Sequence, residues 1–148
     1  MPGSLARTLH AWGLKRVTRI EELADQRGSY LFLLRVPDAS IKVGTVGPIR
    51  FRKGLYGYVG SANGRSVTLA HRLGRHLRLD KARRWHIDYL TSHRLVTPVA
   101  AYVSRGSVLP EERLARLCVK RFPVITGFGN SDLRGATPGH LFLLQTGS

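Results

Sequence analysis

The hydrophobic period of the chain changes within one short stretch, YVGSANGRSVTLAHRLGRHL, at residues 58–77. The opening Tyr-Val-Gly has the composition of a strand end, whereas Leu69, Leu73 and Leu77 recur at every fourth position. A recurrence of this kind places side chains on one face of a helix, whereas strands alternate. The stretch therefore predicts a strand, a small polar loop and a helix in immediate succession.

Apolar runs before this stretch predict an antiparallel sheet. Residues 28–36, GSYLFLLRV, are typical of a buried strand because glycine and proline bound an apolar run. Residues 40–47 are expected to pair with it, and residues 49–62 to supply a third strand. Pro37 and Asp38 make a plausible turn between the first two. The three strands would form a meander that brings their tyrosines within reach of one another.

The rest of the chain completes a small α+β fold with helices on a mostly antiparallel sheet. The expected elements are helices at 83–93 and 109–122, a strand at 95–103 near an edge because it contains Pro98, and a closing strand at 139–144. With 148 residues the chain can bury a core of its own. We expect one domain at residues 27–148, preceded by an N-terminal helical appendage at residues 1–26.

The charge of the chain predicts an anionic partner. Lysine and arginine number 24 against 9 aspartates and glutamates, a formal net charge of +15. Nucleic acid is the most common partner of such a surface, although a basic protein that binds RNA or anionic lipid without chemistry has the same composition.

No run approaches the ~18–20 apolar residues of a membrane span. A single cysteine excludes an internal disulfide framework and favours a reducing compartment, so we expect a cytoplasmic protein.

Basic residues concentrate around the predicted helix at 69–77. Phosphate-tracking surfaces are built from such local excesses of positive charge. The residues that we expect to contact nucleic acid are Arg65, Arg75, Arg78, Lys81, Arg83 and Arg84.

Arg72 and His76 are the first candidate catalytic pair. They are four residues apart, so both project from one side of the helix, next to its leucine stripe. A guanidinium can bind a phosphate in a fork, and an imidazole can exchange a proton with an oxygen. Tyr30 and Tyr58 could reach the same place from the sheet. The alternative is a solvated basic helix beside ordinary core tyrosines.

A phosphodiesterase also needs a group that can hold a divalent cation. Glu111 shares a helical face with Leu114 and Cys118, so it should point inward, and Glu112 on the neighbouring face is its rival. Either carboxylate could instead complement the N-terminus of the helix. The block WHIDYL adds His86 and Asp88 as residues that could orient a histidine, bind a metal or cap a turn.

Taken together, these residues resemble the GIY-YIG nuclease superfamily. In more detail the chain resembles an uncharacterised subfamily that is sometimes fused to endonuclease III-type glycosylases, over roughly residues 27–145. The blocks that carry the resemblance are GSY at 28–30, GLYGYVGSA at 54–62, RLGRHL at 72–77, WHIDYL at 85–90, FGNSD at 128–132 and GHLF at 139–142. Ser29 replaces the usual isoleucine, and the cysteines that many relatives carry are replaced here by Glu112, Leu133 and Gly135.

The resemblance implies a compact α/β sandwich with a three-stranded antiparallel sheet. It also implies one divalent ion, Mg²⁺ or Mn²⁺, held by a glutamate. Carried onto this chain, Tyr30 and Tyr58 are the motif tyrosines, Arg72 stabilises the phosphate, and Glu111 binds the metal. His76 is the histidine of the same helix, and Gly60 lets the backbone pass close to the site. The residues expected to support the site from behind are His86, Asp88, Asp132 and His140.

These observations predict a metal-dependent endonuclease that acts on nucleic acid, with DNA favoured over RNA. The alternatives are a non-catalytic nucleic-acid-binding module and an accessory partner of a DNA repair enzyme that works through residues 1–26. The sequence leaves open which tyrosine would be the base.

Overall fold

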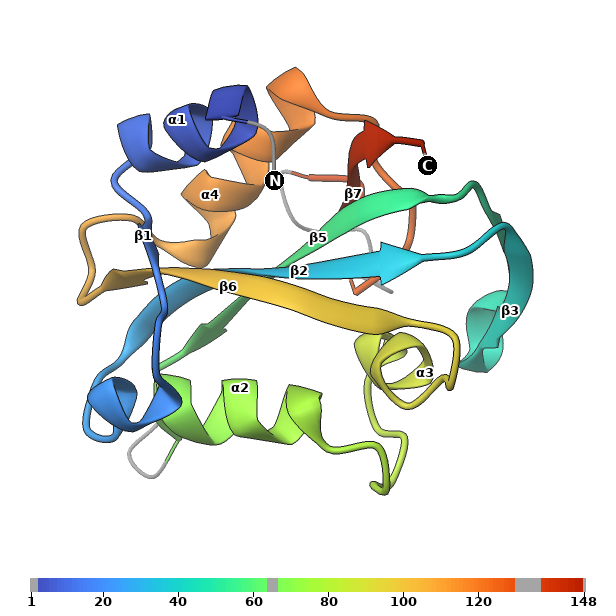
Figure 1. The fold of residues 1–148 in the computed structure, drawn as a ribbon, viewed down its shortest axis with the longest axis horizontal. Helices are drawn as coiled ribbons and strands as arrows, with labels where there is room; N and C mark the ends of the chain where they lie inside the picture. Colours follow the sequence, from blue (N-terminus) through green and yellow to red (C-terminus); the bar gives the residue numbers. More distant parts are fainter. Residues whose placement is uncertain (1–2, 64–66, 130–136, 148) are drawn as a thin grey trace.

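The computed structural model describes residues 3–63, 67–129 and 137–147, and Figure 1 shows their fold. The elements in chain order are α1 (Gly3–Ala11), β1 (Lys15–Arg16), the 3₁₀ helix η1 (Ile20–Leu23), β2 (Gly28–Val36), β3 (Ala39–Val43), the 3₁₀ helix η2 (Gly44–Val46), β4 (Gly47–Phe51), β5 (Gly54–Ala62), α2 (Leu69–Leu77), α3 (His86–Thr91), β6 (Thr97–Arg105), α4 (Glu111–Arg121) and β7 (Leu141–Thr146). The mixed α+β class that the sequence predicts is confirmed.

The main sheet has five strands, so the prediction of a three-stranded sheet was wrong. It is antiparallel, with the order β1-β6-β2-β5-β7. The central strand β2 pairs with β5 on one side and β6 on the other, and eight of its nine residues are buried. A strand buried in this way needs a partner along each edge, because its backbone polar groups cannot reach water. β6 and β7, which are distant in sequence, extend the sheet to five strands.

Helices cover both faces of this sheet (Figure 1). Helices α2 and α3 lie on one face and α1 and α4 on the other. Alternate residues of β2 divide between the two faces: Tyr30 and Phe32 join the core beneath α2 and α3, whereas Leu31 and Leu33 join the core beneath α1 and α4. The expected sandwich therefore has three layers and two hydrophobic cores, one on each face.

The expected pairing of residues 40–47 with the first strand was wrong. These residues supply β3, which pairs with β4 in a separate two-stranded ribbon whose register runs from Ala39 opposite Phe51 to Val43 opposite Gly47. The run at 49–62 contains parts of two strands, and β5 takes the edge of β2 along its whole length. The ribbon buries Ile41, Val43 and Phe51 in the α2-side core, so it is packed against the domain.

Pro98 lies near an open edge, as the sequence predicts. β6 follows β2 in the sheet order and β1 follows β6, but β1 pairs only with Tyr102 and Val103. At the other end of β6, Leu33 pairs with Ala100 and Leu34 with Pro98, so the register shifts by one residue. Such an irregularity accommodates a residue that has no N–H to donate to the ladder.

The N-terminal segment carries one α-helix, as expected, and also a short strand. Leu5 and Leu9 of α1 are buried with Cys118 of α4 in the same core, and β1 forms an edge of the sheet.

Cys118 is fully buried, and burial raises the pKa of its thiol to about 12. The division of the chain into domains at residue 26 stays a prediction. In the described part of the chain, every helix is too short or too polar to cross a membrane.

Candidate functional site

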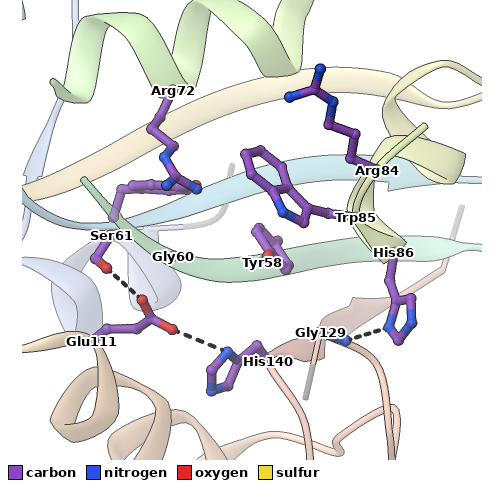
Figure 2. Close-up of a pocket in the computed structure, with 11 residues that line it drawn as sticks. Tyr58, Gly60, Ser61, Arg72, Arg84, Trp85, His86, Glu111, Gly129 and His140 are labelled. Carbon is purple, nitrogen blue, oxygen red and sulfur yellow. Dashed lines mark hydrogen bonds and ion pairs between the residues drawn. The ribbon is translucent and has the colours of Figure 1, made fainter. Parts of the chain in front are cut away.

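A pocket of about 320 Å³ opens at the edge of β5. The register of β7 along β5 runs from Gly54 to Tyr58, so Gly60 and Ser61 lie beyond it. Side chains from both faces of the sheet reach this place, as Figure 2 shows. The residues that line the pocket are Tyr30, Tyr58, Gly60, Ser61, Arg72, Arg84, Trp85, His86, Glu111, Gly129 and His140.

The pocket brings together the four side chains that the sequence analysis placed at one site. Tyr30 comes from β2, Tyr58 from β5, Arg72 from α2 and Glu111 from the first turn of α4. Their convergence agrees with the expectation, while the roles given to them stay predictions. Tyr56 follows a different course: its hydroxyl donates to the Arg52 carbonyl at 2.8 Å, outside the pocket.

Tyr30 and His76 form a buried pair beneath the pocket. The phenolic oxygen lies 2.8 Å from His76 Nε2, and each residue is only 1% exposed. Burial raises the pKa of Tyr30 well above its ordinary value. Burial, with a smaller contribution from the Lys81 ammonium, lowers the pKa of His76 to about 3. Both groups are therefore neutral near pH 7.

Gly60 makes room for the ring of Tyr30. The two residues face each other across β2 and β5, and a Cβ on Gly60 would lie 2.4 Å from Cζ and from the oxygen of Tyr30. No side chain fits at that separation. The sequence analysis assigned to Gly60 a close approach of the backbone to the site wall, and the group that approaches is the Tyr30 phenol.

Arg72 packs on an aromatic surface that the sequence analysis did not assign to the site. Its guanidinium lies 4.6 Å from the centre of the Trp85 ring, and the guanidinium of Arg75 lies 4.7 Å from it. A guanidinium over a tryptophan face is attracted by the negative face of the ring. This contact restricts Arg72, which also lines the pocket.

Asp88 stands behind the pocket and is fully buried. Its Oδ2 accepts hydrogen bonds from Arg75 at 2.6 Å and from the backbone N–H groups of Arg84 and Trp85 at 2.8 and 2.9 Å. It therefore fixes the segment that carries two pocket residues and does not itself line the pocket. Asp88 acts here as an anchor of the turn before α3.

The basic residues around α2 divide into two groups. Arg75 has only 11% of its side chain exposed and is paired with Asp88, and Lys81 Nζ donates to the carbonyls of Arg75 and His76 at 2.9 and 3.2 Å. Burial lowers the pKa of Lys81 to about 8. The hydrogen bonds of these two cations are therefore made within the protein, at the end of α2. Of the predicted phosphate contacts, those that are exposed are Arg78, Arg83 and Arg84, and Arg65 lies outside the described residues.

Glu111 is the acidic group of the pocket. Its Oε1 accepts a hydrogen bond from Ser61 Oγ at 2.6 Å, and its Oε2 lies 3.3 Å from His140 Nδ1 (Figure 2). Its side chain is 32% exposed. Glu112 does not line the pocket, so the geometry favours Glu111 as the residue that could hold a metal. Ser61 was missed, although its place directly after Gly60 at the end of the strand was a usable signal.

The two histidines that line the pocket occupy different settings. His140 is 9% exposed, and its Nε2 is buried with no partner among the residues that the structure describes. His86 Nδ1 accepts the backbone N–H of Gly129 at 2.8 Å, which assigns the proton of its neutral ring to Nε2. Burial lowers the pKa of His86. Asp132, the fourth residue expected to support the site, lies outside the described residues.

The donor set of the pocket fits one type of metal binding. The described residues contain no group of three or more histidine, cysteine or carboxylate side chains that could enclose an ion. Mg²⁺ is commonly held by one or two carboxylates and keeps several waters, which the partly exposed Glu111 permits. A closed structural zinc site would need four ligands. Glu111 is therefore the pocket residue that could contribute a carboxylate to a hydrated ion of this kind.

Comparison with known proteins places the whole site within one family. No curated protein and no solved structure matches the chain significantly. A family model described as "Domain of unknown function DUF123" matches residues 29–148, a range that contains every residue lining the pocket. Since the match covers far more than half of the 148 residues, the chain belongs to the DUF123 family.

Proposed function

We propose that the protein is a GIY-YIG-type endonuclease that hydrolyses phosphodiester bonds in nucleic acid with one Mg²⁺ or Mn²⁺ ion. We favour DNA over RNA as its substrate. The observation that carries this proposal is the presence of Tyr30, Tyr58, Arg72 and Glu111 in a single pocket. The net charge of +15 supports an anionic substrate. The narrower resemblance, to the subfamily fused to glycosylases, is part of the same proposal.

In this mechanism Arg72 binds the scissile phosphate. Its guanidinium lines the pocket and rests on the Trp85 ring at 4.6 Å, so little conformational entropy is lost when a phosphate binds. A planar guanidinium can donate two parallel hydrogen bonds to the non-bridging oxygens. Charge that develops on these oxygens in the transition state is stabilised most when the donor is already in place.

Tyr58 is the phenol that we assign as the proton acceptor for the attacking water. It is half-buried and lines the pocket, whereas the Tyr30 oxygen is engaged with His76. Burial, and after it the Glu111 carboxylate, raise the pKa of Tyr58, and the Arg72 guanidinium lowers it. When bound by Glu111, a divalent ion supplies positive charge that stabilises the phosphate in the transition state and opposes the effect of the carboxylate on Tyr58.

Two features favour a second candidate, a nucleic-acid-binding module without turnover. Burial raises the pKa of both phenols, which disfavours the phenolate that would act as a base. Both oxygens of Glu111 already have partners, at Ser61 and His140. Such a module would bind DNA with a strong salt dependence and leave it intact.

A cleavage assay separates the two candidates. Plasmid, single-stranded and branched DNA are incubated with the protein and Mg²⁺ or Mn²⁺, and products are resolved by electrophoresis. Arg72→Ala and Glu111→Gln should each reduce cleavage by roughly 10²–10³-fold, with Arg116→Ala and Glu112→Gln as matched controls that retain activity. Tyr58→Phe should lose more activity than Tyr30→Phe.

The outcomes distinguish the candidates clearly. If no substrate is cut while binding remains sensitive to salt, the non-catalytic candidate holds. Full activity of Arg72→Ala would overturn the proposed site. A larger loss in Tyr30→Phe than in Tyr58→Phe would reverse the assignment of the base.

A further inference from the structure

Trp85 is a large aromatic side chain that is fixed in place and nevertheless open to solvent. Its ring is 38% exposed and lines the pocket between Arg72 and Arg84 (Figure 2). Its backbone N–H donates to Asp88 Oδ2 at 2.9 Å, and Asp88 is fully buried. Most aromatic side chains of this size contribute burial to a core. Trp85 therefore offers a fixed and partly exposed aromatic surface in the lining of the pocket.

Charged groups fix the orientation of the ring. The guanidiniums of Arg72 and Arg75 lie 4.6 and 4.7 Å from its centre, and Arg75 is itself held by Asp88 at 2.6 Å. A ring held in this way loses little freedom when a ligand stacks on it. Preorganisation of this kind lowers the entropic cost of binding.

The groups around the ring define the chemistry of its ligand. Arg72 and Arg84 supply positive charge to the same pocket, which suits a phosphate, and the part of the Trp85 ring that the two guanidiniums leave exposed supplies an apolar surface beside it. Phosphate next to a planar aromatic group is the composition of a nucleotide. The pocket volume of about 320 Å³ is at the small end of ligand sites, which suits a ligand of about the size of one nucleotide.

We propose that Trp85 is a stacking platform for one unpaired base of a DNA strand, adjacent to the phosphate held by Arg72. This inference rests on the proposed function, because it assumes that nucleic acid enters this pocket, and it narrows the substrate to single-stranded or locally unpaired DNA. Aromatic platforms bind single strands with little sequence preference, because every base presents a π-face. Paired bases are stacked within a duplex and do not offer this face.

The test compares two probes of equal charge in EDTA, so that no cutting can occur. One probe is an oligodeoxythymidylate of about ten nucleotides, and the other is a strand of the same length in which tetrahydrofuran units replace every base. The chain has two tryptophans, so Trp12→Phe leaves Trp85 as the only tryptophan emitter. In that protein the base-bearing probe should quench the emission, and the abasic probe should not.

Affinities of Trp85→Leu complete the experiment. We expect this variant to bind the base-bearing probe about tenfold more weakly, with Trp85→Phe intermediate. The abasic probe should lose clearly less affinity, because it loses only the restriction that the ring places on Arg72. A matched duplex pair, one fully paired and one with a single bulged base, should show the same preference for the unpaired base.

Two results would overturn the inference. Equal binding of both probes by the parent protein would show that no base is recognised. An equal loss for both probes in Trp85→Leu would show that the ring only positions the arginines. Two further outcomes separate this inference from the proposed function. If the base-bearing probe quenches Trp85 but nothing is cut when Mg²⁺ or Mn²⁺ is added, the proposed hydrolysis is refuted and the platform is retained. If the base-bearing and abasic probes are cut equally in the presence of the metal, only the platform is refuted.

Discussion

The two walls of the pocket differ in how deeply their residues are buried. The wall formed by Tyr30, Arg72 and Trp85, together with His76 and Asp88 that support it from behind, is called the α2 wall here. It is continuous with a hydrophobic core, and Tyr30 and His76 are each 1% exposed. The wall formed by Ser61, Glu111 and His140, the α4 wall, carries the acid, whose side chain is 32% exposed. Residues of the first wall therefore support the fold as well as the site, whereas Glu111 can exchange its partners for ligands at little structural cost.

The largest effect that would sharpen this comparison is expected from Asp88→Ala. The substitution removes the carboxylate partner of the Arg75 guanidinium, which is 11% exposed and keeps only the Ala82 carbonyl as an acceptor, and it removes the acceptor for two backbone N–H groups. Breaking one side of a buried ion pair costs about 3–5 kcal/mol, measured here as the free energy of unfolding in urea. Asp80→Ala, at an exposed position, should change it by less than ~0.5 kcal/mol. Similar losses in the two variants would show that the α2 wall does not carry the fold.

The second-largest effect is expected from lowering the pH, which should destabilise the α2 wall. The pKa of His76 is about 3 in the folded chain and near 6.5 when unfolded, so the unfolded state binds the additional proton. Stability should therefore fall as the pH drops from about 6.5 towards 3, by at most ~1.4 kcal/mol per pH unit. His76→Gln should flatten this slope in urea titrations from pH 7 to 4, leaving a smaller slope of the same sign from His86. An unchanged slope would exclude His76 as its source.

Two glycine substitutions test the fit of Tyr30 against β5. Gly60→Ala places a methyl group 2.4 Å from the Tyr30 ring atoms and should destabilise the protein by about 1–3 kcal/mol. Gly74→Ala is the matched control, because its added methyl meets no atom within 4 Å and the residue lies inside α2. Alanine favours a helix over glycine, so this variant should gain about 0.5–1 kcal/mol. The midpoint of thermal unfolding should therefore be lower for Gly60→Ala than for Gly74→Ala, and the opposite order would contradict the proposed fit of Tyr30.

The smallest change in stability is expected on the α4 wall. Ser61→Ala removes one hydrogen bond to the Glu111 carboxylate, which should cost about 0.5–1.5 kcal/mol because water can reach this partly exposed carboxylate. The affinity for Mn²⁺, measured by calorimetry, should also fall about tenfold, because a partner that orients the carboxylate is lost. Ser107→Ala, an exposed position, should change neither quantity. Strong destabilisation without a change in affinity would reverse the proposed contrast between the walls.

Periodicity predicted the parts of the site that lie on regular elements. Arg72 and His76 follow from the four-residue recurrence that defines α2, and the choice of Glu111 over Glu112 follows from the helix face shared with Leu114 and Cys118, both buried. The expected boundaries of α3 and α4 enclose the observed ones. Local sequence determines the element and the face on which these residues lie. Their assignment to one site rested on the family resemblance, because spacing alone left the alternatives open.

Long-range pairing accounts for what the sequence did not predict. The partner of Asp88 is Arg75, thirteen positions earlier, and the partner of Glu111 is Ser61, fifty positions earlier. The ribbon of β3 and β4 was missed because the run at 49–62 was treated as one strand. The order of the five strands depends on which distant segments pair with the two edges of β2, and local sequence patterns do not predict that pairing.

The burial of Cys118 makes the chain convenient for site-directed labelling. It is the only cysteine, and its thiol is fully buried with a pKa raised to about 12, so thiol reagents meet almost no background reaction in the folded state. A cysteine introduced at the exposed Arg84 position would be the sole reactive handle. A photo-crosslinker attached there could trace the path of a bound strand out of the pocket, nucleotide by nucleotide.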